Sequence, residues 1–195
     1  MKPQAVFTVD LEWPWHATRL PEDWPPKTGE WEIAVVERLV KQLGRYGVKA
    51  RFFILGHLAH QDPDVVRYIE ENGHQLGSHG YWHRHNEAQG DTSDQKTRQM
   101  IEGMFEVYEQ RRVVVTHYRS PFWDTTPWPG PCGGVWFRLL PLPVLRWFIA
   151  RAGMFYVHPH DLQLTREGPL RRRVTIGNPW QRLEWVLRNV EWQTP

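Results

Sequence analysis

The sequence is poor in cysteine, lacks long apolar runs and carries almost no excess of charge of either sign. Its single cysteine, Cys132, excludes an intramolecular disulfide and fits a reducing compartment. No stretch reaches the roughly 18 consecutive apolar residues expected of a membrane-spanning helix. The 24 Lys and Arg residues nearly balance the 22 Asp and Glu residues, so the net charge of +2 carries no sign of nucleic-acid binding. A chain of 195 residues is expected to form one domain, residues 1–195.

The N-terminal segment MKPQAVFTVDLEW contains a lysine but no apolar core of the kind found in signal peptides. We therefore expect no cleaved secretory signal and a cytoplasmic location. The apolar run FRLLPLPVLRWFIA is interpreted as a buried core helix, and peripheral contact with a membrane surface is the alternative. The sequence contains no indication of an oligomeric state.

Tryptophan is unusually frequent, with 12 residues in 195, and several lie in the loop-like stretches WPWHATRLPEDWPP and PFWDTTPWPGPCGG. Because a tryptophan face can stack on a sugar ring, these residues predict either the lining of a carbohydrate groove or packing within loops. For Trp13 and Trp128 packing is the first interpretation, and Trp13 is kept as a candidate substrate contact.

Segments with strand character alternate with segments of helical periodicity along the chain. Strands are expected at residues 4–10, 49–55, 74–78, 113–118 and 154–157. Helices are expected at residues 31–46, 62–72, 93–107, 144–153 and 178–192, with a turn at Gly56. This alternation predicts an α/β fold with a parallel sheet or an α/β barrel, in which ligand sites form at the carboxyl ends of strands.

Polar residues obey that rule, because Asp10, His79, Arg119 and His158 each stand where a predicted strand ends. Segments that are far apart in the sequence would then supply side chains to one edge of the sheet. This arrangement predicts a functional site.

A candidate metal site follows from His79 and His83 in SHGYWH and from Asp10 and Glu12 in FTVDLEW. A helical turn at 79–83 would point both imidazoles to one side, since residues four apart share a helix face. Residues two apart share a strand face, so Asp10 and Glu12 would lie on the same side. One carboxylate would bind the metal and the other would act as a base. Histidines on the surface or in other pairings are the alternative.

Several motifs together resemble the polysaccharide deacetylases of the NodB-homology group, also called carbohydrate esterase family four. FTVDLEW resembles the first motif of that family, SHGYWH its metal-binding motif, YRSPFW its third motif and FYVHPHD its last motif. The intervening segment KARFFILGHLAHQDPDVVRYIEENGHQLGSH is similar to the family's core stretch. The segments GGVWFRLLP and VHPH and the arginine-rich tail most resemble a subgroup with a D-x-E first motif, which is linked to exopolysaccharide or O-antigen systems. The fold that the resemblance implies is an irregular (β/α)7-type barrel.

The resemblance also implies a metal-dependent deacetylation of a carbohydrate substrate. A divalent metal, which we expect to be Zn²⁺, would be held by Glu12, His79 and His83. Asp10 would act as the catalytic base on a metal-activated water, and Arg119 would pair with Asp10 and orient it.

The remaining motifs imply an acid and a substrate groove. His158 would protonate the departing amine, and a backbone N–H near Phe122 or Trp123 would help to stabilise the oxyanion. The substrate contacts implied are Pro121, Phe122 and Trp123, together with Trp13.

The chain departs from the family pattern in two places. Most members have adjacent aspartates in the first motif, the second of which binds the metal, whereas Leu11 stands at that position here. Three interpretations follow: Glu12 binds the metal and Asp10 is the base, these roles are reversed, or no metal binds.

The second departure concerns the family's fourth motif, whose aspartate tunes the catalytic histidine. Asp161 and Asp124 are both candidates for that aspartate. The choice of His158 over His160 as the acid rests on the strand phase and on the motif.

Three functions therefore remain. The first is a metal-dependent deacetylase that acts on an N-acetylated sugar of a surface polysaccharide or its precursor. The second is a metal-free amidohydrolase of the allantoinase-like branch, suggested by Leu11. The third is a non-catalytic glycan-binding protein on the same fold, suggested by the unplaced fourth motif. A two-histidine, one-carboxylate iron oxygenase is a more remote alternative.

Overall fold

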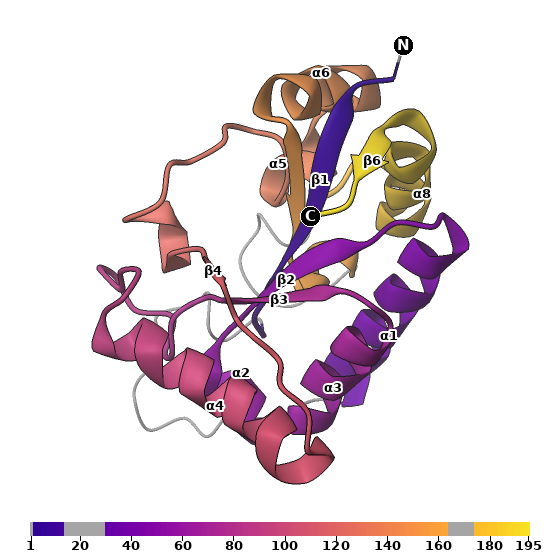
Figure 1. Cartoon of the computed structure of the whole chain (residues 1–195). Coiled ribbons are helices and arrows are strands. Elements are labelled where there is room, and N and C mark those ends of the chain that lie inside the picture. Colours follow the sequence, from indigo (N-terminus) through magenta and orange to yellow (C-terminus); the bar gives the residue numbers. More distant parts are fainter. Residues whose placement is uncertain (1, 14–29, 164–173) are drawn as a thin grey trace. The chain divides into compact units, whose positions relative to one another are not determined.

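The computed structural model describes residues 2–13, 30–163 and 174–195 of the chain (Figure 1). The strands are β1 (Gln4–Leu11), β2 (Ala50–Ile54), β3 (Gln75–Ser78), β4 (His117–Tyr118), β5 (Met154–Val157) and β6 (Glu191–Gln193). The α-helices are α1 (Glu30–Arg45), α2 (Gly56–Gln61), α3 (Pro63–Glu71), α4 (Thr92–Glu109), α5 (Val135–Leu139), α6 (Leu142–Ala152) and α8 (Pro179–Asn189). The 3-10 helices η1 (Pro121–Trp123) and η2 (Pro159–Leu162) follow β4 and β5.

The chain divides into two compact units. The first unit contains residues 1–9, 34–51 and 129–195, and the second unit contains residues 10–33 and 52–128. The division falls within β1, within α1 and within β2. The single domain expected for residues 1–195 stays a prediction.

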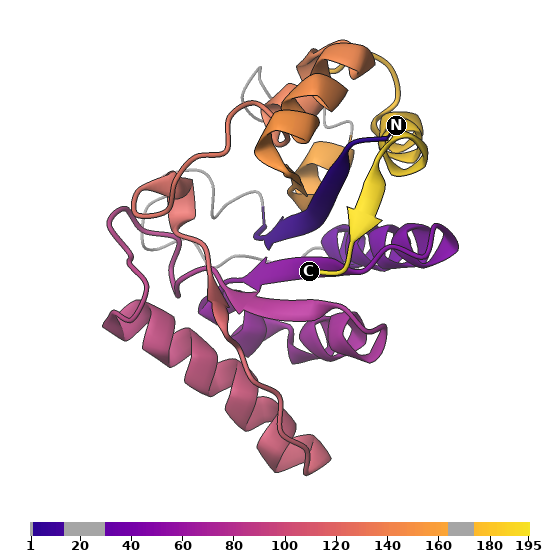
Figure 2. The ribbon, with the colours of Figure 1, turned by 45° about the horizontal axis from the view of Figure 1, so that its top comes forward.

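In the first unit, β1 runs parallel to both β5 and β6 (Figure 2). Val6 is paired with Met154 of β5 and with Gln193 of β6, so the two strands lie on opposite sides of β1. Phe7 is fully buried and its ring meets the ring of Phe155 edge to face at 5.2 Å. Helix α6 packs on β5 and on α8. A strand that is buried on both faces is typical of a parallel sheet covered by helices.

In the second unit, β3 lies between β2 and β4 and is parallel to β4, with Gly77 opposite His117. Helix α4 packs on α2, α3 and β3, and Figure 1 shows α4 beside α2. Backbone hydrogen bonds continue past the strand ends, since the N–H of His79 donates to the carbonyl of Ile54 at 2.9 Å. The N–H of Arg119 likewise donates to the carbonyl of Ser78 at 3.0 Å. The chain segments that leave β2, β3 and β4 are therefore neighbours.

The predicted α/β class with a parallel sheet is confirmed, and the strand expected at 154–157 matches β5 in both bounds. Closure of the strands into a barrel stays a prediction.

The strand expected at 113–118 is wrong for its first four residues, because β4 contains only His117 and Tyr118. Backbone groups before β4 bond to side chains of α4 instead of a neighbouring strand. The N–H of Val115 donates to Glu102 at 2.8 Å, and its carbonyl accepts from Arg98. An apolar run alone does not reveal that such partners exist.

Two further boundaries are corrected. Gly56 is the first residue of α2 rather than a simple turn. The closing helix ends at Asn189, not at residue 192, because Val190 is extended and the next residues pair with β1 as β6. Trp192 then packs on Phe7 with ring centroids 5.2 Å apart, which gives this aromatic side chain an apolar contact in a strand.

Helix α6 has one buried and one exposed apolar face. Leu145 and Ile149 are fully buried, whereas Val144 and Trp147 are 42% and 54% exposed. The expectation of a core helix therefore holds for one face, and membrane contact through the other stays a prediction. Among the described residues, no helix combines the length and the apolar character needed to cross a bilayer.

Candidate metal centre and active site

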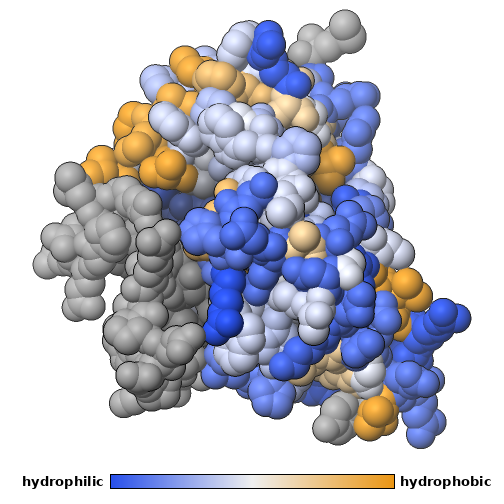
Figure 3. All heavy atoms as spheres, turned by 90° about the vertical axis from the view of Figure 1, so that its left-hand side faces the viewer, coloured by the Kyte–Doolittle hydropathy of each residue, from blue (hydrophilic) through white to orange (hydrophobic). Residues whose placement is uncertain are grey.

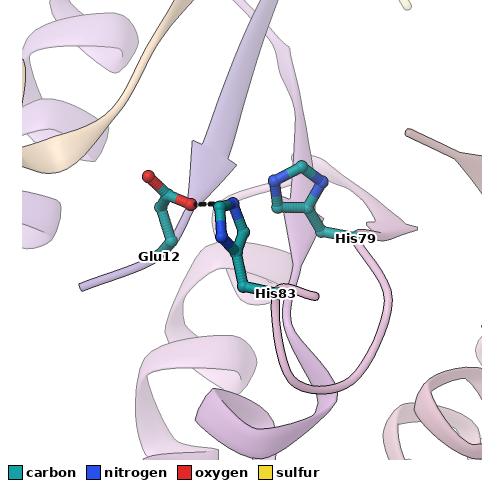
Figure 4. A group of neighbouring side chains, drawn as sticks. All are labelled: Glu12, His79 and His83. Carbon is teal, nitrogen blue, oxygen red and sulfur yellow. Dashed lines mark ion pairs between the residues drawn. The ribbon is translucent and has the colours of Figure 1, made fainter. Parts of the chain in front are cut away.

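Glu12, His79 and His83 gather at one point in the second unit (Figure 4). Glu12 directly follows β1, His79 directly follows β3, and His83 lies in the loop between β3 and α4. One ligand atom of each side chain lies within 4.8 Å of the others, and all three residues are buried. Two imidazole nitrogens and a carboxylate oxygen form a donor set that zinc and related divalent ions accept. The residues present therefore fit a divalent transition metal.

The surroundings of His79 fix the tautomer and the charge of its ring. Nδ1 lies 2.8 Å from the carbonyl oxygen of Arg119. Because a carbonyl only accepts, Nδ1 carries the hydrogen, and Nε2 is the nitrogen with a lone pair. Burial lowers the pKa of His79 to about 4, so the ring is neutral at pH 7. Metal-binding histidines commonly have their second ring nitrogen fixed in this way.

His83 and Glu12 contact each other directly. His83 Nε2 lies 2.5 Å from Glu12 Oε2, and their side chains are only 4% and 2% exposed. A buried carboxylate is costly without a cationic partner or hydrogen bonds, so this contact holds Glu12 toward the histidines. The side-chain orientations in Figure 4 agree with this pairing.

The helical turn expected at 79–83 is wrong, because this segment is a loop. Gly80 and His83 have positive φ angles of 75° and 58°, which an α-helix does not contain. The carbonyl of Gly80 accepts from the N–H of Gly56 at 3.0 Å and from the hydroxyl of Thr97 at 2.9 Å. The carbonyl of Tyr81 accepts from the N–H of His57 at 3.1 Å. These distant partners, and not i to i+4 spacing on a helix, bring the two histidines together.

Gly80 is required by close packing as well as by its φ angle. A Cβ atom at this position would lie 1.9 Å from Oε2 of Glu87. Glu87 is itself buried, which raises the pKa of its carboxyl, and its Oε1 accepts the N–H of Trp82 at 3.2 Å. The loop that carries both histidines thus packs against the Glu87 carboxyl group at Gly80 and Trp82.

Asp10 and Arg119 form a buried ion pair close to the cluster of Glu12, His79 and His83, which we call the metal-type cluster. Arg119 Nη1 lies 2.5 Å from Asp10 Oδ1, and the side chains are 3% and 2% exposed. The guanidinium lies 4.1 Å from the ring centre of Phe53 and 4.5 Å from that of Trp123. The pair implied by the resemblance is present. Phe53 is absent from the predicted site residues, because a phenylalanine in a buried strand indicates only a core position.

Asp10 and Glu12 do not share a strand face, so that expectation is wrong. Each of the two carboxylates has its own partner. Strand β1 ends at Leu11, and the N–H of Glu12 donates to the carbonyl of Asp10 at 3.1 Å in a tight turn. Leu11 is fully buried. The turn, and not strand alternation, directs Glu12 to His83 while Asp10 meets Arg119.

The predicted substrate contacts differ in exposure. Pro121 is buried, whereas Phe122 is 40% exposed and its ring lies 4.4 Å from that of His83. Phe122 and Trp123 have consecutive positive φ angles of 55° and 62°, conformations that are strained for side chains of this size. Strain of this kind is frequent at functional sites.

Trp13 does not offer a face to a sugar in this structure, because it is fully buried. Its indole N–H donates to Asp62 at 3.2 Å. The packing interpretation therefore describes Trp13 better than a substrate contact. Trp128 is 54% exposed.

His158 belongs to the first unit and forms a pair with Asp161. His158 Nδ1 lies 2.8 Å from Asp161 Oδ2, which also accepts the backbone N–H of His158 at 2.9 Å. Burial alone would raise the pKa of Asp161, but its interactions with His158 outweigh this effect and lower it to about 2. A carboxylate on Nδ1 fixes the imidazole and leaves Nε2 as the nitrogen that can carry a proton.

The two candidate aspartates are distinguished by their partners. Asp124 Oδ2 lies 2.8 Å from His85 Nδ1, in a pair that is partly exposed. Asp161 is therefore the aspartate that contacts His158. The signal available in the sequence is the three-residue spacing in HPHD, which permits a turn with both side chains on one side.

His158, His160 and Asp161 also have ligand atoms within 4.8 Å of one another. The rings of His158 and His160, however, are stacked with centroids 4.7 Å apart and planes inclined by only 13°. Lone pairs of imidazole nitrogens lie in the ring plane, so two parallel stacked rings do not direct them to one ion. We interpret this group as a histidine–aspartate pair with a stacked neighbour.

Comparison with known proteins places these features in a family. The family model described as polysaccharide deacetylase matches residues 28–126 of the chain. The peptidoglycan-N-acetylglucosamine deacetylase PgdA of Listeria monocytogenes is 28% identical over 116 residues, which cover 60% of this chain and 23% of that protein. The chain thus spans less than a quarter of that curated relative's length.

Solved structures show the same fold at low sequence identity. The Xyl-CE4 domain of a multidomain xylanase from the hindgut metagenome of Trinervitermes trinervoides has a TM-score of 0.56 at 15% identity, with 99% of this chain and 87% of that chain covered. A wild-type CE4-family pseudoenzyme from Bacillus anthracis has a TM-score of 0.55 at 16% identity, with 81% and 55% covered. Because the family model matches half of its length, the chain belongs to the polysaccharide deacetylase family.

Proposed function

We propose that this protein is a metal-dependent hydrolase that removes acetyl groups from the nitrogen of a sugar in a surface polysaccharide or its precursor. The observation that carries the proposal is the buried cluster of Glu12, His79 and His83 in the same unit as the Asp10–Arg119 pair. The name of the relative from Listeria monocytogenes, an N-acetylglucosamine deacetylase, supports an N-acetylated substrate.

In this proposal Glu12, His79 and His83 hold the metal, which we expect to be Zn²⁺. His79 contributes Nε2, because its Nδ1 donates to the carbonyl of Arg119. A bound divalent ion supplies Lewis acidity that polarises the acetyl carbonyl and acidifies water. The contact between Glu12 and His83 favours Glu12 over Asp10 as the third ligand.

Asp10 is the proposed base. Its carboxylate accepts a proton from the attacking water while the water oxygen forms a bond to the acetyl carbon. Arg119 holds Asp10 through the 2.5 Å ion pair, and Phe53 and Trp123 restrict the guanidinium from two sides. Arg119 is therefore a positioning residue in this scheme.

His158 is the proposed acid. When the carbon–nitrogen bond breaks, the sugar nitrogen takes a proton and leaves as an amine, and acetate is the second product. The Asp161 carboxylate accepts from Nδ1 of His158, so Nε2 is the atom from which that proton would come. The role of His158 rests on the motif FYVHPHD and on this pairing.

Two other functions follow from specific observations. Leu11 occupies the position of a metal-binding aspartate, which keeps a metal-free amidohydrolase as the second candidate. One neighbour with this fold is described as a pseudoenzyme, which keeps a non-catalytic glycan-binding protein as the third. The subgroup linked to exopolysaccharide or O-antigen systems and the cytoplasmic location belong to the proposal on the basis of the sequence alone.

Metal analysis tests the centre of the proposal. The purified protein is expected to contain about one equivalent of divalent metal per chain, and His79→Ala is expected to lose most of it. His60→Ala is the matched control, because His60 is an exposed histidine of the same unit. Wild-type protein that binds no divalent metal under metal-replete conditions would exclude the first candidate and favour the second or third.

The third ligand is tested by Glu12→Gln and Asp10→Asn. We expect Glu12→Gln to lose metal and activity together, and Asp10→Asn to keep the metal while acetate release falls by about a hundredfold or more. Metal loss confined to Asp10→Asn would reverse the two roles.

Acetate release separates an enzyme from a binding protein. The metal-loaded protein is expected to release acetate from at least one member of a panel of N-acetylated glycans. Binding of a glycan without acetate release across the panel would favour the third candidate.

A further inference from the structure

A pocket of about 470 Å³ opens beside the loop that carries the two histidines. Its walls come from the segment between β3 and α4 and from the first two turns of α4, all within the second unit. Residues that line it include Tyr81, Trp82, Arg84, His85 and Lys96. Figure 3 views the side on which this loop lies in Figure 1, and hydrophilic residues dominate that face.

The pocket adjoins the candidate metal centre. Trp82 directly precedes His83 in the chain. His85, which lines the pocket, stacks on Phe122 with ring centroids 4.2 Å apart and planes inclined by 15°. Phe122 in turn contacts His83 at 4.4 Å. The pocket and the candidate metal centre are therefore adjacent parts of one loop region.

An exposed aromatic ring forms part of the pocket wall. Trp82 is 47% exposed, although its ring contacts two other rings. Tyr81 meets it edge to face at 4.8 Å, and the ring of His57 lies 4.7 Å from it. These contacts restrict the indole, so its exposed surface is ordered before a sugar ring arrives.

Cations surround this aromatic wall. Lys96 Nζ lies 3.8 Å from the ring centre of Tyr81 and 6.0 Å from that of Trp82, and Arg84 Cζ lies 5.8 Å from the Trp82 ring. Both cationic residues are exposed. Contacts between cations and aromatic faces hold the charges at the pocket without neutralising them.

The acidic residues that line the pocket are directed to the backbone. Glu87 Oε1 accepts the N–H of Trp82 at 3.2 Å. Asp91 Oδ1 accepts the N–H of Asp94 at 2.8 Å, and Asp91 Oδ2 accepts the N–H of Ala88 at 2.7 Å. These carboxylates face the loop backbone and the start of α4. Glu87 is buried and Asp91 is half-buried, so the exposed charged side chains that line the pocket are those of Arg84 and Lys96.

We propose that this pocket binds an acidic sugar, one that carries a carboxylate or a phosphate group, next to the sugar that loses its acetyl group. Trp82 stacks on the ring of the acidic sugar, while Lys96 and Arg84 attract its negative group. The inference rests on the proposed function for the identity of the neighbouring sugar. It extends that function by naming the charge of the substrate.

Binding to two defined hexasaccharides tests the inference by calorimetry. Hyaluronan hexasaccharide alternates N-acetylglucosamine with a carboxylate-bearing sugar, and chitohexaose contains N-acetylglucosamine alone. We expect the acidic hexasaccharide to bind at least about tenfold more tightly at low salt, and this preference to shrink as salt is raised. A 6-phosphorylated chitohexaose distinguishes a phosphate-bearing ligand from a carboxylate-bearing one.

Variants assign the preference to the pocket. Lys96→Gln and Arg84→Gln are each expected to weaken binding of the acidic ligand about three- to tenfold and to leave the neutral ligand unchanged. Lys41→Gln is the control, since Lys41 is an exposed lysine paired with Glu37 in the first unit. Trp82→Ala is expected to weaken the binding of both the acidic and the neutral ligand. Thermal unfolding of each variant checks that the fold is retained.

Two outcomes would overturn the inference: equal affinity for acidic and neutral ligands, or an acidic preference that Lys96→Gln and Arg84→Gln leave intact. Its failure is distinct from failure of the proposed function. If the protein releases acetate from chitohexaose and from the acidic ligand with the same kcat/KM, the proposed function stands and the charge preference fails. If the protein prefers the acidic ligand but releases no acetate, the charge preference stands and the proposed function fails.

Discussion

The cluster of Glu12, His79 and His83 takes its side chains from the ends of two strands and a loop, whereas His158 and Asp161 lie in one turn. The first arrangement depends on hydrogen bonds from residues such as Gly56 and Thr97, which are distant in the sequence. The second depends on contacts within four residues.

The two regions also hold their buried ionisable groups in opposite charge states. His79 is kept neutral, because burial outweighs the nearby carboxylates of Asp10 and Glu12 and lowers its pKa to about 4. Asp161 is kept charged, because its contacts with His158 outweigh burial and lower its pKa to about 2. The first region suits a neutral metal ligand and the second a proton-carrying pair. Substitutions remote from the ligands should therefore disturb the first region and leave the second intact.

The largest effect is expected from Arg119→Ala. This change leaves the Asp10 carboxylate buried without its cationic partner, which typically costs about 4 kcal/mol of unfolding free energy. Acetate release should fall by about a hundredfold or more, since Asp10 loses its orientation. Urea unfolding and acetate assays measure the two effects.

Two comparisons sharpen that prediction. Arg67→Ala removes an exposed pair with Asp64 and should cost less than about 1 kcal/mol. The double variant Asp10→Asn with Arg119→Ala should be more stable than the sum of the single effects predicts, because no buried charge remains. Additive effects would mean that the ion pair does not couple the two residues.

A smaller effect is expected from Gly80→Ala. The new Cβ would collide with the Glu87 carboxyl and would occupy a left-handed conformation, so the protein should lose about 3 kcal/mol of unfolding free energy. Metal affinity should fall by about ten- to a hundredfold, because the loop between His79 and His83 must shift.

Gly90→Ala is the matched control for this loop. Gly90 also has a positive φ angle, 80°, but a Cβ there would meet no atom within 4 Å. Gly90→Ala should lower the unfolding free energy by only about 1 kcal/mol, through conformational strain, and should leave metal affinity unchanged. Equal losses in the two variants would show that strain alone, and not the contact with Glu87, accounts for the effect. Competition with a chelator measures metal affinity in both.

The same difference between regions explains what the sequence could predict. Residues 154–157 form an apolar run between clear boundaries, and β5 matches it in both bounds. The histidine spacing in SHGYWH and the resemblance to known motifs indicate the three residues that the structure brings within 4.8 Å of one another, Glu12, His79 and His83. Their role as metal ligands stays a prediction, and the helix expected between the two histidines is wrong. Its loop is fixed by partners such as Thr97, which no local pattern identifies.

Long-range partners also account for the other errors. Nothing in the run at 113–116 shows that Glu102 and Arg98 bind its backbone in place of a strand. The contact of the Phe53 ring with the Arg119 guanidinium forms because β2 and β4 lie on either side of β3. Asp161, by contrast, lies three residues from His158, so its contact with that histidine is local, although the sequence left Asp161 and Asp124 as equal candidates.

The smallest effect separates the two histidine–aspartate pairs. The pKa of Asp161 is lowered from 3.8 to about 2 on folding, so its ionisation stabilises the folded state above about pH 4. This contribution, about 2 kcal/mol, is lost as the pH falls through about 2, where both the folded and the unfolded forms become protonated. Asp161→Asn should therefore be less stable than wild type by about that amount at pH 5, and the difference should shrink between pH 4 and pH 2.

Asp124→Asn is the control, and it should lower the unfolding free energy by less than about 1 kcal/mol, because the His85–Asp124 pair is partly exposed to solvent. Urea unfolding over this pH range measures both, and a pH-independent loss in Asp161→Asn would mean that Asp161 acts through its hydrogen bonds and not through its charge.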